Sequence, residues 1–306
     1  MTAYLLTLLL MILLAPILLS FMKALKMWLL FKRPISLLQG YRNFAKLMQK
    51  ETIISSEASS VTRFAPFLVL SPLLLLLFFL PPVVAGAYYV SFVDAFTLTG
   101  LLALSTFFLM LLGLDSASAF GGIGASREAF ISALVEPAMV LTLFSVSLMA
   151  DNLGLAQAGV NLATHFPQAH MASYLFAGIS FFILLITENG RMPVDNPETH
   201  LELTMIHEAM TLDLTGVYLA MIETAASIKF VIFASLFASL FMPFGLHLSF
   251  IPALLLFVVK LFVIAAGVAL IEVSMAKLRL FKVPNLLGIA MVFAFLSLVT
   301  FYVLGA

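Results

Sequence analysis

Hydrophobic residues are gathered along the chain into eight runs, each bounded by charges, Pro or Gly. Each run has the roughly 20 mainly apolar residues that a helix needs to span the hydrocarbon layer of a membrane. The runs cover residues 3–28, 64–90, 94–114, 129–150, 171–190, 216–242, 248–272 and 284–304. They predict an all-α integral membrane protein with eight transmembrane helices in a single domain, residues 1–306.

A shorter amphipathic pattern lies between the first two runs. Leu37, Tyr41, Phe44 and Met48 recur at helical spacing, and polar or cationic residues occupy most positions between them. This pattern predicts an interfacial helix in the first cytoplasmic loop. Such a helix serves either as a membrane-surface anchor or as a docking site for a partner.

Composition excludes several classes of protein. The chain is 63% hydrophobic and 10% charged, whereas soluble domains are about 45–50% apolar and about 25% charged. Fifteen Lys plus Arg balance fifteen Asp plus Glu, so nothing favours nucleic-acid binding. Because the chain has no cysteine, it can form neither a disulfide nor a thiolate-bound iron–sulfur cluster. Any redox centre is therefore expected on another subunit.

The placement of the cations predicts the orientation. Every odd-numbered connection between spans contains Lys or Arg, and every even-numbered connection contains none. By the positive-inside rule, the odd connections are cytoplasmic and both termini lie outside. The loop cations are Lys23, Lys26, Lys32, Arg33, Arg42, Lys46, Lys50, Arg63, Arg127, Arg191, Lys277, Arg279 and Lys282.

Six charged residues fall inside spans or at their ends. They are Glu136, Glu188, Glu223, Lys229, Lys260 and Glu272. Each would cost about 2.5–3.5 kcal/mol at the centre of the bilayer, so they are expected to face the bundle interior, pair, bind water or be neutral. Glu223 and Lys229 do not share a helical face, which places their partners on other helices. Glu272 and Arg279 do share one and predict an anchoring pair. Ionisable residues inside a membrane usually mark ion paths, so all six are candidates for proton coupling.

The connection after the fifth span is unusually acidic for a cytoplasmic loop. Arg191 is its only cation beside the acids Glu188, Asp195, Glu198, Glu202, Glu208 and Asp213. Pro193 and Pro197 break helix, and a short helix is expected from Glu198 onward. His200 and His207 could share a helical face, but without a third suitably spaced ligand a hydrogen-bonded pair is favoured over a metal site. The simplest alternative is a solvated acidic loop.

Several motifs resemble one protein family. They are Gly113-Leu-Asp115, Ile123-Gly-Ala-Ser-Arg127-Glu128, Val135-Glu136-Pro137, Glu188-Asn-Gly-Arg191-Met-Pro193-Val-Asp195, and the string from Thr199 to Glu208. These segments resemble the membrane subunit of hydrogenase-4 and formate hydrogenlyase, which is homologous to complex I subunit 1 (the NuoH family). The likeness covers most of the chain.

The resemblance implies a subunit of the bacterial or archaeal cytoplasmic membrane that holds no cofactor itself. Its expected partners are hydrogenase-like large and small subunits, which hold a [NiFe] centre and Fe–S clusters, together with antiporter-like subunits and a small membrane subunit. Residues implied at the interface with the redox arm are Asp115, Arg127, Glu128, Arg191, Asp195, Glu198, His200, Glu202, His207, Glu208 and Asp213.

The leading hypothesis is a non-catalytic subunit that anchors the redox arm and couples it to proton translocation. One alternative is a quinone-chamber subunit. Against it, Lys32-Arg33-Pro34 lacks the glycine of the family's Arg-Gly-Pro element, and Asp213-Leu214-Thr215-Gly216 replaces Glu-Tyr-Ser-Gly. A second alternative keeps the architecture with a formate- or ferredoxin-oxidising arm. A stand-alone transporter ranks last because the two halves show no repeat.

Overall fold

The protein is an all-helical bundle in the computed structural model, which describes residues 2–79, 93–116, 118–165, 170–196, 205–245 and 248–304. The helices of these residues are α1 (Thr2–Leu29), α2 (Gln39–Gln49), α3 (Val61–Phe79), α4 (Ala95–Asp115), α5 (Ala119–Met149), α6 (Leu155–Thr164), α7 (Met171–Glu188), η2 (Glu208–Met210), α8 (Gly216–Phe241), α9 (Phe250–Ser274), η3 (Leu280–Lys282) and α10 (Val283–Leu304). Eight of them are long and apolar enough to cross a membrane, which confirms the predicted fold class.

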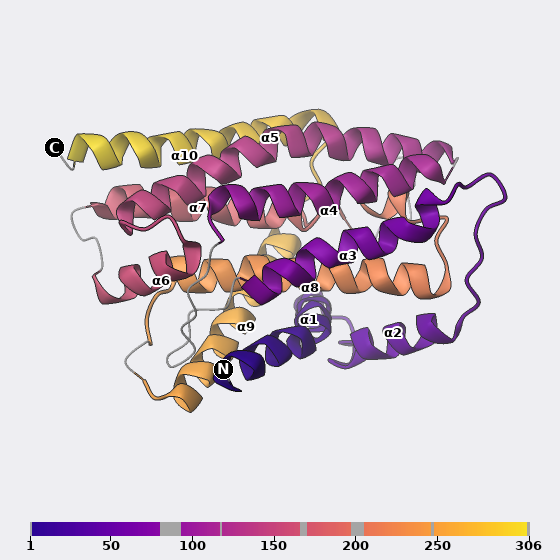
Figure 1. The fold of residues 1–306 in the computed structure, drawn as a ribbon, viewed down its shortest axis with the longest axis horizontal. Coiled ribbons are helices and arrows are strands. Elements are labelled where there is room, and N and C mark those ends of the chain that lie inside the picture. Colours follow the sequence, from indigo (N-terminus) through magenta and orange to yellow (C-terminus); the bar gives the residue numbers. More distant parts are fainter. Residues whose placement is uncertain are drawn as a thin grey trace.

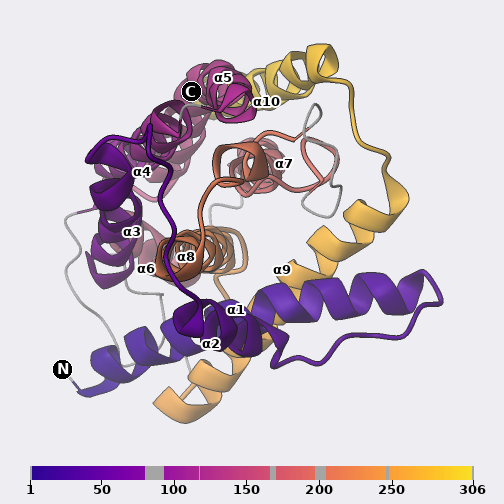
Figure 2. The same ribbon diagram turned by 90° about the vertical axis from the view of Figure 1, so that its right-hand side faces the viewer.

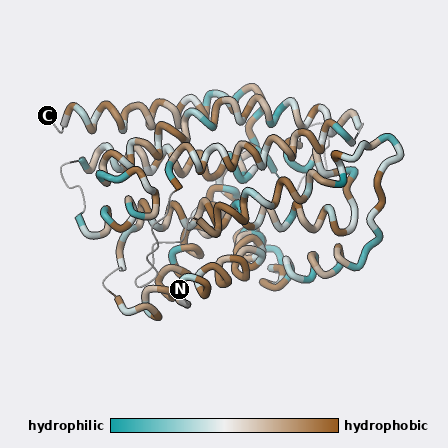
Figure 3. Tube along the Cα trace, viewed as in Figure 1, coloured by the Kyte–Doolittle hydropathy of each residue, from teal (hydrophilic) through white to brown (hydrophobic). Residues whose placement is uncertain are grey.

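Helices α7 and α8 occupy the middle of the bundle (Figure 2). Most of the long helices run along its length, whereas α1 and α9 cross it obliquely (Figures 1 and 2). Helix α8 is the most deeply buried of the eight, and its Phe230 and Phe233 are fully enclosed with Phe181 of α7. Hydrophobic residues cover the long helices, and polar residues gather in α2 and at the chain turns (Figure 3).

Two helices begin three or more residues before their predicted spans. Helix α5 begins ten residues before the predicted span, because the Ser118 hydroxyl caps its first turn by accepting a hydrogen bond from Gly121 N at 3.1 Å. Helix α3 begins at Val61, and Asp115 Oδ2 accepts hydrogen bonds there from Ser59 N and Thr62 N at 3.1 and 2.9 Å. Helix α6 was not predicted. The predicted span 64–90 can be followed only to residue 79, since 80–92 lie outside the described residues.

The four cation-bearing connections meet at one end of the bundle, here called the loop end. Ile53 N donates to Thr215 Oγ1 at 2.8 Å, which joins the first and fifth-to-sixth span connections. Leu278 N donates to Pro193 O at 2.8 Å and adds the last connection. The amphipathic segment forms α2, which packs against α1 and α8 and has no buried residue. Its interfacial position, the cytoplasmic side of the loop end and the outside termini stay predictions.

Candidate functional site

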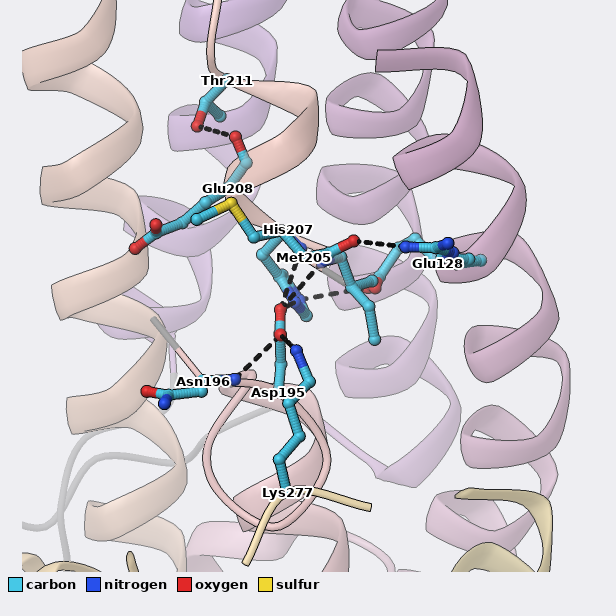
Figure 4. A network of polar contacts seen from close by, with 10 residues as sticks. Glu128, Asp195, Asn196, Met205, His207, Glu208, Thr211 and Lys277 are labelled. Atoms are coloured by element: carbon cyan, nitrogen blue, oxygen red, sulfur yellow. Dashed lines mark hydrogen bonds and ion pairs between the residues drawn. The ribbon is translucent and has the colours of Figure 1, made fainter. Parts of the chain in front are cut away.

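Asp195 is the centre of the polar network at the loop end (Figure 4). The residue is buried. Its Oδ2 accepts hydrogen bonds from Ile206 N and His207 N at 3.0 and 3.3 Å, and its Oδ1 accepts one from Lys277 Nζ at 2.7 Å. One carboxylate therefore holds together the loop after α7, the segment before η2 and the turn after α9. Charge-assisted bonds of this kind are stronger than neutral ones.

The turn that positions this loop requires glycine. Helix α7 ends in a Schellman motif, in which Arg191 N donates to Ile186 O and Gly190 N donates to Thr187 O, both at 3.0 Å. Gly190 has φ +55°, and a Cβ there would lie 2.7 Å from Nδ1 of His207. The histidine ring thus packs directly on the glycine backbone.

His207 lies between two acids. Its Nε2 is 3.3 Å from Glu128 Oε1 on α5, and its Nδ1 is 4.0 Å from Asp195 Oδ2. The side chain is 25% exposed, but both ring nitrogens are buried. Burial lowers the pKa of His207, and Lys229 lowers it further, but the carboxylates of Glu128 and Asp195 outweigh both and hold the pKa above its ordinary value. The protonated ring is therefore favoured.

A second ion pair continues the network into the spans. Lys229 Nζ on α8 lies 2.6 Å from Glu188 Oε2 on α7, and both side chains are largely buried. Lys229 also interacts electrostatically with Glu128 and His207, and Glu188 with the half-buried Glu136. The expectation that Lys229 pairs with another helix is confirmed.

Glu272 forms a third buried group, but not with the predicted partner. Its carboxylate lies 3.5 Å from Arg191 Nη1 and 3.7 Å from Lys26 Nζ. The predicted pairing with Arg279 is wrong, because Arg279 lies beyond the end of α9 with an exposed side chain, whereas Glu272 points to α1 and the loop. Arg191 connects this group to Asp195, whose amide donates to the Arg191 carbonyl at 3.2 Å.

Other candidates lie elsewhere. Lys260 Nζ donates to the carbonyls of Met242 and Phe244 at 2.5 and 2.6 Å, past the far end of α8, and pairs with no acid among the residues that the structure describes. Glu223 is exposed on α8 and does not face the bundle interior, which was one of the four alternatives for the charged residues of the spans. It interacts electrostatically with Lys23.

The structure describes the surroundings of three further residues that were predicted to lie at the interface with the redox arm. Asp115 caps α3, Arg127 Nη1 donates to Met205 O at 2.9 Å, and Asp213 is exposed. Glu208 begins η2 beside the network (Figure 4). Glu198, His200 and Glu202 lie outside the described residues, as does the short helix expected from Glu198, so the expected histidine pair is not visible. His207 itself lies beside Glu128 and Asp195.

Sequence reasoning missed Lys277 and Lys26, which it used only to orient the chain. Their positions in the sequence do not indicate that a buried acid from another segment lies nearby. Among the described residues, no group of three His, Asp or Glu side chains could hold a metal ion.

Comparisons with known proteins agree on the family. The NADH dehydrogenase family pattern matches residues 4–304. Formate hydrogenlyase subunit 4 of Escherichia coli is 30% identical over 88% of both chains. Hydrogenase-4 component C of the same bacterium is 34% identical over 68% of this chain and 64% of its own length.

A solved structure supports the fold. A chain of the membrane-bound sulfane sulfur reductase, an archaeal respiratory membrane complex, superposes with a TM-score of 0.81 at 15% identity, covering 97% of this chain and 98% of that one. The protein is a multi-pass membrane protein of the cell membrane. It belongs to the NADH dehydrogenase family and is a homologue of formate hydrogenlyase subunit 4.

Proposed function

We propose that this chain is the non-catalytic membrane subunit that couples the redox arm of a complex I-like hydrogenase to proton translocation. The observation that carries the proposal is the series of ionisable groups that leads from the loop end into the spans. It begins at Lys277 and Asp195, continues through His207 and Glu128, and reaches Glu188 and Glu136 by way of Lys229. Intramembrane acids in such series usually serve ion movement.

The loop end supplies the input. Asp195 fixes the loop that presents His207, and His207 is held between two carboxylates. A change of charge or position in a redox arm seated on this loop alters the balance that keeps His207 protonated. Lys229 interacts electrostatically with both His207 and Glu128 and is paired with Glu188. A change in the charge of His207 therefore alters the electrostatic environment of the acids inside the spans.

The proposed partners follow from the homologues and from the lack of cysteine ligands for a redox centre in this chain. The chain has no cysteine, so the [NiFe] centre and Fe–S clusters would belong to hydrogenase-like large and small subunits. Antiporter-like subunits and a small membrane subunit would receive the signal within the membrane. Subunits of formate hydrogenlyase and of hydrogenase-4 are among the relatives of this chain.

The test is a Glu136→Gln variant of the intact complex, reconstituted in vesicles. The amide keeps the shape of the side chain but cannot carry the charge, so the complex should assemble and transfer electrons while moving fewer protons per electron. Glu57→Gln, in an exposed loop, is the matched control and should leave the ratio unchanged. Full proton output from a normally assembled Glu136→Gln complex would remove Glu136 from the mechanism.

A further inference from the structure

Helix α1 ends with a bulky residue at the left-handed position, where glycine is usual. Lys32 N donates to Met27 O at 2.8 Å and Phe31 N donates to Trp28 O at 3.0 Å, which is the Schellman arrangement also found at the end of α7. The left-handed position of that motif is Gly190 in α7 but Phe31 in α1, where φ is +56°. A bulky residue rarely adopts this backbone conformation. The fold of the turn therefore does not explain why phenylalanine is found here, and the surroundings of its side chain become informative.

That side chain points entirely outward. Phe31 is 100% exposed and the neighbouring Trp28 is 64% exposed. Lys32 and Arg33 follow directly and are exposed as well. An aromatic pair beside two cations at the end of a spanning helix has the composition of a membrane–water interface anchor, where rings sit at the headgroup level and cations reach phosphates.

The start of α10 repeats this combination independently. Phe281, in η3, is 91% exposed and lies between the exposed cations Arg279 and Lys282. Among the large hydrophobic side chains that the structure describes, Phe31 and Phe281 are the two most exposed. The end of α1 and the start of α10 lie at a similar level along the length of the bundle, with α1 at its lower edge and α10 at its upper edge (Figure 1).

We propose that Trp28, Phe31, Lys32 and Arg33 form a binding site for the headgroups of anionic phospholipids, with Arg279, Phe281 and Lys282 as a second contact at the same level. The charge of the occupant follows from the cations, because neither set of residues contains an acid. Each Lys or Arg at an anionic membrane surface favours acidic lipid roughly fivefold. The aromatic rings fix the depth of α1, and the cations select the lipid.

Trp28 provides the readout because it is the only tryptophan of the chain. The full chain is reconstituted in phosphatidylcholine vesicles that contain a fixed fraction of brominated phosphatidylglycerol or, in parallel, brominated phosphatidylcholine. The proposal predicts that the acidic lipid quenches Trp28 fluorescence several times more strongly at equal fraction. Lys32→Gln with Arg33→Gln should make the two lipids equal, whereas Arg63→Gln, an exposed cation at the start of α3, should preserve the preference.

A second variant tests the contribution of the Phe31 ring without disturbing the turn. Phe31→Gly places the preferred residue at the left-handed position, so the turn is kept while the ring is lost. Trp28 in this variant should be quenched less by lipids brominated near the headgroup. Equal quenching of the unmodified chain by both lipids would overturn the proposal, and so would absence of quenching, since Trp28 would then be covered by protein.

Discussion

Helices α5 and α7 hold two polar regions of opposite character. Towards the loop end they carry three acids: Glu128 lies beside His207 of the loop, Glu188 pairs with Lys229 of α8, and Glu136 interacts electrostatically with Glu188. Towards the other end, hydroxyls form the seam with α10, here called the hydroxyl seam. Thr142 and Ser180 are 2.7 Å apart, and Ser145 and Ser297 are 3.0 Å apart.

Charged and neutral polar groups therefore occupy different ends of these helices. In the hydroxyl seam every bond is neutral and its members are buried, as when Ser297 donates to Ser173 O at 2.8 Å. Such bonds specify helix packing in a membrane at small energetic effect. Ionised groups are costly there unless paired, so a set of them concentrated at one end indicates function rather than packing.

The largest expected effect comes from breaking an ion pair on one side. Lys229→Met leaves the largely buried Glu188 without its cation, which should destabilise the protein by about 3–5 kcal/mol. Glu188→Gln combined with Lys229→Met removes both charges and should restore most of that loss. The unfolding midpoint of the purified complex measures both. Equal destabilisation by the single and double variants would show that the pair itself is not the cause.

The next effect concerns the hub of the loop end. Asp195→Ala removes the acceptor of bonds from Lys277, Ile206 and His207 and should cost about 2–3 kcal/mol. Hydrogen exchange should accelerate in residues 190–196 and 205–210. Asp213→Ala, at an exposed position, is the control. Unchanged protection in Asp195→Ala would refute the role of the hub.

A smaller effect depends on pH. Because the folded pKa of His207 is raised, its protonated form stabilises the fold fully below the unfolded value of about 6.5, and the contribution is lost as pH rises through the folded pKa. Stability should therefore decline from about pH 6.5 upward, by at most about 1.4 kcal/mol per pH unit. Calorimetry at several pH values should show less decline for His207→Gln. An identical decline would assign the titration to another group.

The smallest effect is expected in the hydroxyl seam. Ser297→Ala should cost about 0.6 kcal/mol, the average for such bonds between membrane helices, and should leave proton output unchanged. Ser126→Ala, exposed on α5, is its control in the same unfolding measurement. Loss of proton output in Ser297→Ala would contradict the claim that the hydroxyl seam serves packing and the charged region serves coupling.

Hydropathy was enough to predict the eight spans because each run must match the thickness of a membrane. It missed α6, whose ten residues are too few to span. It also missed the first ten residues of α5, where Arg127 and Glu128 interrupt the apolar run.

The site was predictable as a list of acids but not as an arrangement. Helical periodicity states which residues share a face, not which helix lies opposite, so Glu272 was assigned to Arg279 rather than to Arg191 and Lys26. Nothing in the spacing linked His207 with Glu128, which are 79 positions apart along the chain. That contact depends on the loop that Gly190 and Asp195 shape.

The most direct test of the coupling role uses the double variant Glu188→Gln with Lys229→Met in the intact complex. Protons moved per electron transferred are measured in sealed vesicles. We expect the complex to assemble and to continue transferring electrons while its proton movement is lost. An unchanged ratio of protons to electrons in the assembled double variant would contradict the proposal that these charges carry the coupling.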